Sequence, residues 1–303
     1  MKKIIYMGTP HYAKEILDAI VQTNGYEVVL VLTQPDRPAG RKMLLTPPPV
    51  KELALQHAIE VLQSHNLKSQ ELTDRLRELE PDFIIVAAFG QILPKAILDI
   101  APCINLHASI LPKFRGASPL QQALLENESY TGVSAMLMNE GLDTGDILGY
   151  RYFNIPPTMC LNGLMEQLTY DAAKLTLDVL ERFDGLVALR QLDVEASLCK
   201  KIKREAGEVD FRDAKDLYNR YRAYEGWPNI FTKEKLKLLE VELLDSESIH
   251  QEGEILSIDK EGVVVGCLQG KVRIKKLQPQ SKKPMEAKAY CVARGIKSGD
   301  CIV

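Results

Sequence analysis

The sequence has few of the residues on which several protein classes depend. Its six cysteines are scattered, with no Cys-x-x-Cys pair, and none of its five histidines stands at metal-ligand spacing from them. This pattern predicts neither a disulfide framework nor a zinc site. Only a handful of apolar residues precede Gly8 and Pro10, too few for a signal-peptide core or a membrane span. We therefore expect a cytoplasmic protein without a metal.

The glycine-rich loop of dinucleotide-binding proteins is also missing. The first strand-like run leads into Gly8-Thr9-Pro10-His11-Tyr12-Ala13, which has one glycine where the dinucleotide fingerprint needs three. A nicotinamide cofactor is therefore not expected. We interpret Thr9 as the N-cap of the following helix and Pro10 as its first residue.

Composition and charge are those of a globular protein with two unlike parts. The 303 residues are 46% hydrophobic and 26% charged, enough for two domains. Residues 1–199 carry a net charge of −7 and residues 200–303 one of +4. The segment from Val264 to Lys297 contains nine basic residues and one acidic residue, Glu286. This region is either a phosphate-binding surface or a solvated, lysine-rich sheet edge that discourages aggregation.

Hydrophobic periodicity in the first part alternates between strands and helices. The runs of strand length are Lys3–Met7, Glu27–Leu32, Phe83–Ala88, Ile104–Leu106, Thr131–Asn139 and Asp146–Ile155. The helical patterns are Ala13–Val21, Val50–Ala58, Ser69–Leu79 and Leu161–Phe183. Such alternation predicts an α/β fold whose Rossmann-like, mostly parallel sheet has helices on both faces. Ligands of such sheets gather at the carboxyl ends of the strands.

The second part of the chain has a different pattern. After a helix at Asp213–Glu225, short β-like runs are separated by turn glycines, which predicts a small antiparallel barrel. These runs are Lys235–Val241, Gly253–Ile258, Val263–Cys267 and Lys271–Leu277. We predict a catalytic domain over 1–186, a basic linker over 187–207 and a smaller barrel domain over 208–303.

An Asn/His pair and an Asp-containing turn form the most informative group of residues. A short apolar run predicts a buried strand on which Asn105 and His107 point to the same face. Further along, the glycines of Gly141-Leu142-Asp143-Thr144-Gly145 predict a tight turn that presents a carboxylate. Each element alone has an ordinary structural explanation, because buried histidines and glycine turns are common. Together they predict the catalytic residues Asn105, His107 and Asp143.

The wider pattern resembles a known family. With the Ser-x-Leu-Pro-x-x-Arg-Gly run from Ser109 to Gly116, the order and spacing of these motifs resemble those of folate-dependent formyltransferases. That resemblance covers the chain from Lys3 nearly to its end. It implies 10-formyltetrahydrofolate as the formyl donor and a C-terminal domain similar to an OB fold. For Arg115 it leaves two roles open, shaping the loop or facing the substrate, and we favour the first.

A long loop narrows the choice of substrate. The segment from Thr33 to Pro49 is far longer than a usual βα connection. It contains the motif Thr-Gln-Pro-Asp-Arg-Pro-Ala-Gly-Arg. This motif resembles the loop that family members acting on methionyl-tRNA insert at the acceptor end of the tRNA. Lys42 is followed by Met43-Leu44-Leu45 where many members are more basic. We therefore expect weaker phosphate binding and more apolar stacking there.

The resemblance also implies binding residues. It places the folate against the residues Phe89, Gly90, Gln91, Ile92, Leu93, Ser109, Leu111 and Pro112. The candidate tRNA-binding residues are the basic side chains Arg37, Arg41, Lys42, Lys203, Arg204, Lys271, Lys275 and Lys282. Without the family, Phe89–Leu93 is equally well explained as an ordinary strand-to-helix turn.

These expectations combine into one function with two alternatives. The main hypothesis is transfer of the formyl group from 10-formyltetrahydrofolate to the α-amino group of initiator methionyl-tRNA, by a monomer, for translation initiation. Asp143 would take the amine proton, while Asn105 and His107 would stabilise the tetrahedral oxyanion. A second hypothesis is a formyltransferase for a small amine, such as glycinamide ribonucleotide or an amino sugar. A third is an inactive nucleic-acid-binding protein of similar fold, which would have no use for the three catalytic residues.

Overall fold

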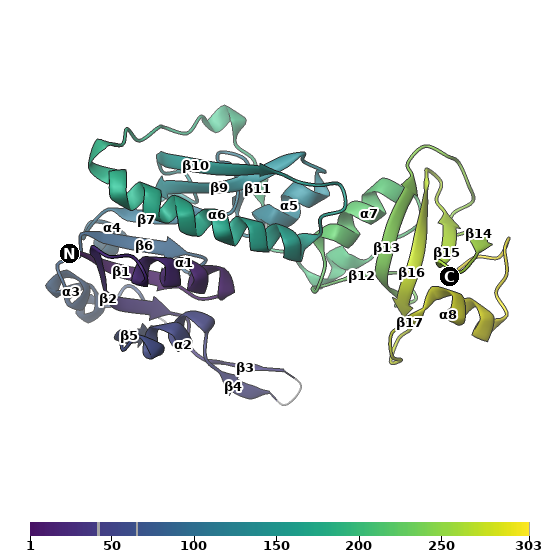
Figure 1. Ribbon diagram of the computed structural model, residues 1–303, viewed down its shortest axis with the longest axis horizontal. Helices are drawn as coiled ribbons and strands as arrows, with labels where there is room; N and C mark the ends of the chain where they lie inside the picture. The colour runs from purple at the N-terminus through teal and green to yellow at the C-terminus, as the bar shows by residue number, and fades with distance from the viewer. Residues whose placement is uncertain (41–42, 65, 303) are drawn as a thin grey trace. The chain divides into compact units, whose positions relative to one another are not determined.

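A seven-stranded, mostly parallel sheet forms the centre of the first part of the molecule (Figure 1). The computed structural model describes residues 1–40, 43–64 and 66–302. The strand order is β10-β9-β7-β6-β1-β2-β5, in which β9 runs antiparallel to β7 and β10 antiparallel to β9. These strands are β1 (Lys2–Gly8), β2 (Tyr26–Thr33), β5 (Val61–Gln63), β6 (Phe83–Ala87), β7 (Cys103–His107), β9 (Tyr130–Leu137) and β10 (Ile147–Asn154).

Helices cover the sheet because its central strands are apolar on both faces. Ile5 and Met7 of β1 pack in one cluster with Ile84 and Val86 of β6 and with Ile97. The next strand residues on the opposite face are also fully buried, as expected of a parallel sheet. The α-helices up to residue 182 are α1 (His11–Val21), α2 (Pro49–Gln56), α3 (Gln70–Glu78), α4 (Lys95–Leu98), α5 (Pro119–Leu125) and α6 (Leu161–Arg182).

The long loop after β2 contains a β-hairpin. Its strands are β3 (Arg37–Ala39) and β4 (Leu44–Thr46), and it extends away from β2 and α2 (Figure 1). Lys51 fixes its base, since Nζ lies 2.9 Å from Oδ1 of Asp36, and this hydrogen bond lowers the pKa of Asp36. At the far end Leu44 and Leu45 are about two-thirds exposed.

Smaller elements complete the first part. After α6 come two 3-10 helices, η1 (Phe183–Gly185) and η2 (Asp193–Glu195). The short strand β11 (Leu198–Cys199) then pairs in parallel with β8 (Arg115–Gly116). Gly149 of β10 lies against Leu175 and Val179, so α6 covers this edge of the sheet.

An antiparallel sheet dominates the second part. Its strands follow the order β12-β13-β16-β15-β14, with β17 paired to β16. The strands are β12 (Ile230–Phe231), β13 (Lys237–Asp245), β14 (Ile255–Ile258), β15 (Val263–Gly266), β16 (Lys271–Gln278) and β17 (Met285–Glu286). The helices after residue 200 are η3 (Arg204–Gly207), α7 (Ala214–Ala223) and α8 (Ala287–Arg294).

The predicted fold class is confirmed, because a mostly parallel α/β sheet and a separate antiparallel sheet are both present. The compact units are residues 1–119, 130–154 and 165–199 for the first, and 120–129, 155–164 and 200–303 for the second. The predicted boundaries at 186 and 207 remain a prediction. In the described residues, no helix has the length and apolar character that a membrane span requires.

The predicted capping at the first helix is wrong. Pro10, not Thr9, is the N-cap of α1, and the helix begins at His11. The Thr9 hydroxyl instead donates to the carbonyl of Phe89 and accepts from the amide of Gln34, both at 3.4 Å. Thr9 therefore joins three loops at the carboxyl edge of the sheet.

A buried arginine ties together the second unit. Arg222 of α7 is only 2% exposed. Its Nη1 donates to the carbonyl of Pro157 at 2.8 Å, and its Nη2 donates to Oδ1 of Asn127 at 3.3 Å. These acceptors come from two segments distant in sequence, so one guanidinium holds both segments against α7.

We expect Arg222→Met to lower the free energy of unfolding of the second unit by about 2–3 kcal/mol, because it leaves buried acceptors unpaired. The fluorescence of Trp227, the only tryptophan, reports the stability of this unit during urea unfolding. The matched control is Arg220→Met on the same helix, whose partly exposed ion pair with Asp216 contributes about 1 kcal/mol or less. Equal unfolding midpoints for the two variants would contradict this role.

Candidate active site

Asn105 and His107 lie at the carboxyl end of β7, beside the carboxyl end of β6. Their positions two apart on one strand put both side chains on the same face. His107 is buried, with 6% of its surface exposed, whereas Asn105 is partly exposed. Among the described residues, no side-chain hydrogen-bond partner of Asn105 is found, so its amide is free to meet a substrate.

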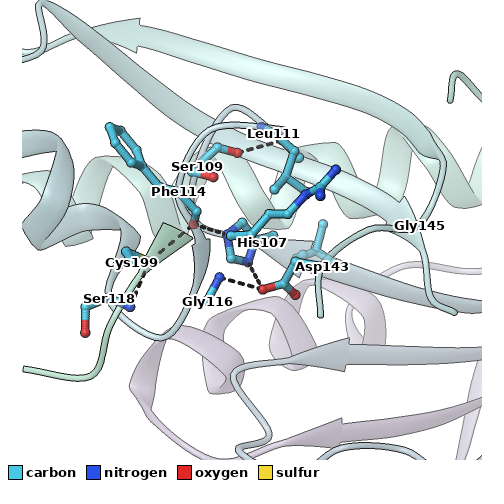
Figure 2. Close-up of polar contacts among 12 residues, drawn as sticks. His107, Ser109, Leu111, Phe114, Gly116, Ser118, Asp143, Gly145 and Cys199 are labelled. Atoms are coloured by element: carbon cyan, nitrogen blue, oxygen red, sulfur yellow. Dashed lines mark hydrogen bonds and ion pairs between the residues drawn. The ribbon is translucent and has the colours of Figure 1, made fainter. Parts of the chain in front are cut away.

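Both ring nitrogens of His107 face protein oxygens. Nε2 lies 3.0 Å from the carbonyl of Phe114, and Nδ1 lies 3.7 Å from Oδ2 of Asp143 (Figure 2). A carbonyl only accepts hydrogen bonds, so Nε2 carries a proton. The distance from Nδ1 is longer than a hydrogen bond. Nδ1 is therefore the nitrogen available to exchange a proton beside the Asp143 carboxylate.

The turn that carries Asp143 is held from both sides. Asp143 has a φ of +53°, a left-handed conformation that is uncommon outside glycine. Oδ1 of Asn139 accepts hydrogen bonds from the Gly141 amide at 2.9 Å and the Thr144 hydroxyl at 2.8 Å. A Cβ at Gly145 would collide with the carbonyl of Leu137. The pattern Gly-Leu-Asp-Thr-Gly thus fits a turn packed closely against the end of β9.

The amide of Gly116 fixes the carboxylate itself. Gly116 N–H donates to Oδ2 of Asp143 at 2.8 Å, the same oxygen that faces His107 (Figure 2). Gly116 has a φ of +118°, and a Cβ there would collide with the carbonyl of Cys199. Glycine is therefore required for the backbone to reach the carboxylate.

Gln191 and Arg115 support the turn through hydrogen bonds that the sequence does not predict. Gln191 Nε2 donates to the carbonyls of Asp143 at 2.9 Å and Gly145 at 2.7 Å. Its Oε1 accepts from Nε and Nη2 of Arg115 at 3.0 and 2.8 Å. Arg115 is buried and also pairs with Asp193 at 3.0 Å. These contacts give Arg115 a loop-shaping role. Gln191 carries no motif, so no local signal in the sequence marks it.

The chain matches two family models that together cover most of its length. Residues 2–180 match the formyl transferase model, and residues 201–294 match the model of the formyl transferase C-terminal domain. The chain belongs to the formyl transferase family.

Relatives over the full chain are named methionyl-tRNA formyltransferases. The chain is 58% identical over 301 residues to that of a Sulfurovum species, with 99% of each chain covered. It is 50% identical to that of a Nitratiruptor species, over 98% of this chain and 99% of the relative. The resemblance inferred from the motifs is thereby confirmed.

Solved structures at lower identity share the fold. The sugar 3N-formyl transferase WlaRD has a TM-score of 0.68 at 18% identity, covering 93% of this chain and 99% of that one. HypX from Aquifex aeolicus in complex with tetrahydrofolic acid has a TM-score of 0.63 at 18% identity, covering 98% of this chain and 48% of that one. The architecture of this chain is thus shared by proteins with little sequence identity to it.

The predicted folate-binding residues fall into two groups. Phe89 and Leu93 are buried, whereas Gly90 and Ile92 are exposed in the loop that follows β6. The remaining residue of this loop, Gln91, donates to the carbonyl of Ser64 at 3.0 Å. The loop lies at the carboxyl edge of the sheet, beside β7. Its contact with folate stays a prediction.

The second group of predicted folate-binding residues lies in the loop after β7. The Ser109 hydroxyl is buried and donates to the carbonyl of Lys113 at 2.6 Å. Leu111 is also buried, and its carbonyl accepts from the Tyr150 hydroxyl at 3.0 Å. Pro112 is partly exposed. Because their polar groups are satisfied within the protein, Ser109 and Leu111 shape the loop; any folate contact they make stays a prediction.

The predicted tRNA-binding residues are spread over both units. In the hairpin, Arg37 is exposed and donates to Oε1 of Gln34 at 3.3 Å. Arg41 and Lys42 lie outside the described residues. In the second unit, Lys203 and Arg204 are exposed at the start of η3.

Three basic side chains of β16, Lys271, Arg273 and Lys275, pair with acids of their own unit. Lys271 pairs with Asp245 at 3.8 Å and Lys275 with Glu242 at 3.5 Å. Hydrogen bonds from Ser248 and the Glu247 amide hold the pKa of Asp245 at about 2, so this carboxylate stays charged. Arg273, between the two lysines, pairs with acids at 2.8–3.7 Å; these are Glu242, Asp259 and Glu261.

The lysines beyond β16 are different. Lys282 and Lys283 are exposed, and neither lysine forms an ion pair within the described part of the chain.

In the described part of the chain, no group of three or more His, Cys, Asp or Glu side chains is arranged to hold a metal ion.

We expect Gly116→Ala to lower formyl-transfer turnover by roughly 10- to 100-fold, because the new Cβ must push the backbone amide away from Asp143. Steady-state kinetics measure the loss. The matched control is Gly163→Ala in α6, where a Cβ would make only an ordinary contact with Met159 at 3.6 Å. Turnover of Gly163→Ala should match the wild type. Unchanged turnover in Gly116→Ala would show that this amide does not fix the catalytic geometry.

Proposed function

We propose that the protein transfers the formyl group of 10-formyltetrahydrofolate to the α-amino group of methionyl-tRNA, and that the acceptor is the initiator tRNA. One observation carries the proposal. A chain 44–58% identical to eight methionyl-tRNA formyltransferases over nearly its full length has Asn105 and His107 on one strand face and the Asp143 carboxylate beside His107.

The first chemical requirement is a neutral amine. Free α-amino groups titrate near about 7.7–8.0, so a sizeable fraction of the acceptor is already neutral near physiological pH. The remaining proton, or the one released on attack at the formyl carbon, needs an acceptor. The Asp143 carboxylate is 14% exposed and is held by Gly116, so it faces the site in a fixed position. We assign Asp143 this base role, acting through a water molecule.

The second requirement is stabilisation of the tetrahedral oxyanion. The Asn105 amide is a donor without a partner in the described structure, which suits a group reserved for the substrate. His107 differs, since Nε2 already donates to Phe114. Only Nδ1 can act toward the substrate, either as a second donor to the oxyanion or by passing a proton to the departing folate nitrogen.

The donor and acceptor require different surfaces. For the folate we propose the loop after β6, from Phe89 to Leu93, where backbone groups and apolar side chains suit a flat heterocycle. For the tRNA we propose the hairpin, through Arg37, Arg41, Lys42 and its exposed leucines. In the second unit, Lys282 and Lys283 are better phosphate ligands than Lys271 and Lys275, because those two are already paired.

Transfer from 10-formyltetrahydrofolate to purified acceptors tests the function directly. Methionyl-tRNA, uncharged tRNA and glycinamide ribonucleotide should be compared at equal concentrations, with the formylated product identified by mass spectrometry. We expect product from methionyl-tRNA only. Transfer to glycinamide ribonucleotide alone would favour the small-amine alternative, and no transfer to any acceptor would favour an inactive binding protein.

We expect Asn105→Ala to lower kcat by roughly 10²- to 10³-fold while the KM values for both substrates change little, because oxyanion donors act mainly in the transition state. Steady-state kinetics with each substrate varied in turn make the measurement. Asn24→Ala, at an exposed position, is the control and should behave as the wild type. A rise in KM with unchanged kcat would assign Asn105 to substrate binding instead.

A further inference from the structure

The segment from Leu189 to Cys199, which we call the strap, is built into the candidate active site although the sequence predicts it as part of a linker. It begins with an antiparallel β-bridge between Leu189 and Ile147, in which each backbone N lies 2.8 Å from the carbonyl oxygen of the other residue. It ends as β11, paired with the β8 residues that include Gly116. The strap therefore contacts the chain on both sides of the Asp143 turn.

The end of the strap holds the loop that follows His107. Ser197 Oγ accepts from the amide of Phe114 at 2.9 Å, and the Ser197 carbonyl accepts from the amide of Arg115 at 2.8 Å. The Cys199 thiol donates to the Phe114 carbonyl at 3.3 Å, the same oxygen to which His107 donates (Figure 2). Burial raises the pKa of this thiol, which keeps it a neutral donor.

The middle of the strap holds the turn itself. Gln191 is 7% exposed, and all four of its side-chain hydrogen bonds are internal to the site. Two carbonyls, of Asp143 and Gly145, need a donor, while Arg115 needs an acceptor. Among uncharged side chains of this length, only the amide of glutamine supplies a donor and an acceptor together. Gln191 thus forms hydrogen bonds with both the Asp143 turn and the loop that carries Arg115.

We propose that Gln191 is a positioning residue for the reaction, acting through the Asp143 turn, and that the strap couples this turn to the His107 loop. This inference rests on the proposed roles of Asp143 and His107. The amide of Gln191 holds the carbonyl of Asp143, a residue in the left-handed conformation, and so keeps the carboxylate at the Gly116 amide and beside His107 Nδ1. Without this restraint the turn can relax to a commoner conformation and move the carboxylate away.

The variant Gln191→Glu isolates the donor function. It keeps the size of the side chain and an oxygen for Arg115, but turns a carboxylate oxygen toward two carbonyls. Gln56→Glu, at an exposed position at the end of α2, is the matched control. We expect Gln191→Glu to lower kcat by roughly 10- to 100-fold with KM values within about twofold, since a small misplacement of a catalytic group has an effect of this size. Gln56→Glu should retain wild-type kinetics.

A readout independent of activity separates this inference from the proposed function. Hydrogen exchange at the Gly116 amide reports the bond to Asp143, because that amide donates to the carboxylate. We expect faster exchange at Gly116 in Gln191→Glu than in the wild type and in Gln56→Glu. If the wild type formylates none of the acceptors, the proposed function fails, and the exchange measurement still decides whether Gln191 positions the turn.

The double variant with Asp143→Asn completes the test. If Gln191 acts through Asp143, adding Gln191→Glu to Asp143→Asn lowers the remaining kcat by less than about twofold, because coupled residues are not additive. A full additional loss would mean that Gln191 acts elsewhere. Unchanged kcat in the single variant, or unchanged exchange at Gly116, would overturn the proposal, as would a loss of kcat fully accounted for by a smaller folded fraction.

Discussion

The hydrogen bond from the Gly116 amide to the Asp143 carboxylate is the constraint on which the rest of the site depends. It joins two loops that are separated in sequence, and the oxygen that accepts it also faces Nδ1 of His107. Its geometry requires a glycine at 116, since a Cβ there would collide with Cys199. It also requires Asp143 to hold a left-handed backbone conformation. The strap, through Gln191, supports this second requirement.

The sequence predicts much of the first unit because strand periodicity and motif spacing are local signals. The apolar runs at β1, β2, β6 and β7 coincide with the observed strands within one residue at each end. Alternation along β7 is sufficient to put Asn105 and His107 on one face. The glycines around Asp143 likewise mark a turn. Candidate catalytic residues can therefore be selected before any contact between loops is known.

Contacts between distant segments could not be predicted in this way. Gln191 is one ordinary glutamine in a segment expected to be a linker, and its importance follows only from the carbonyls it meets. Thr9 could be expected to cap a helix, but tertiary contacts with Phe89 and Gln34 compete for its hydroxyl. The basic run on β16 suggests a phosphate-binding surface, yet acids from neighbouring strands and turns pair with it.

The chemical shift of the Gly116 amide proton, measured by NMR on deuterated protein, is the most direct test of whether this amide binds the Asp143 carboxylate. A hydrogen bond to a carboxylate should move this resonance well downfield of its random-coil position, and Asp143→Ala should return it upfield. We expect both results. A Gly116 resonance near its random-coil position, or one that Asp143→Ala leaves unchanged, would contradict the claim that this amide holds the carboxylate beside His107.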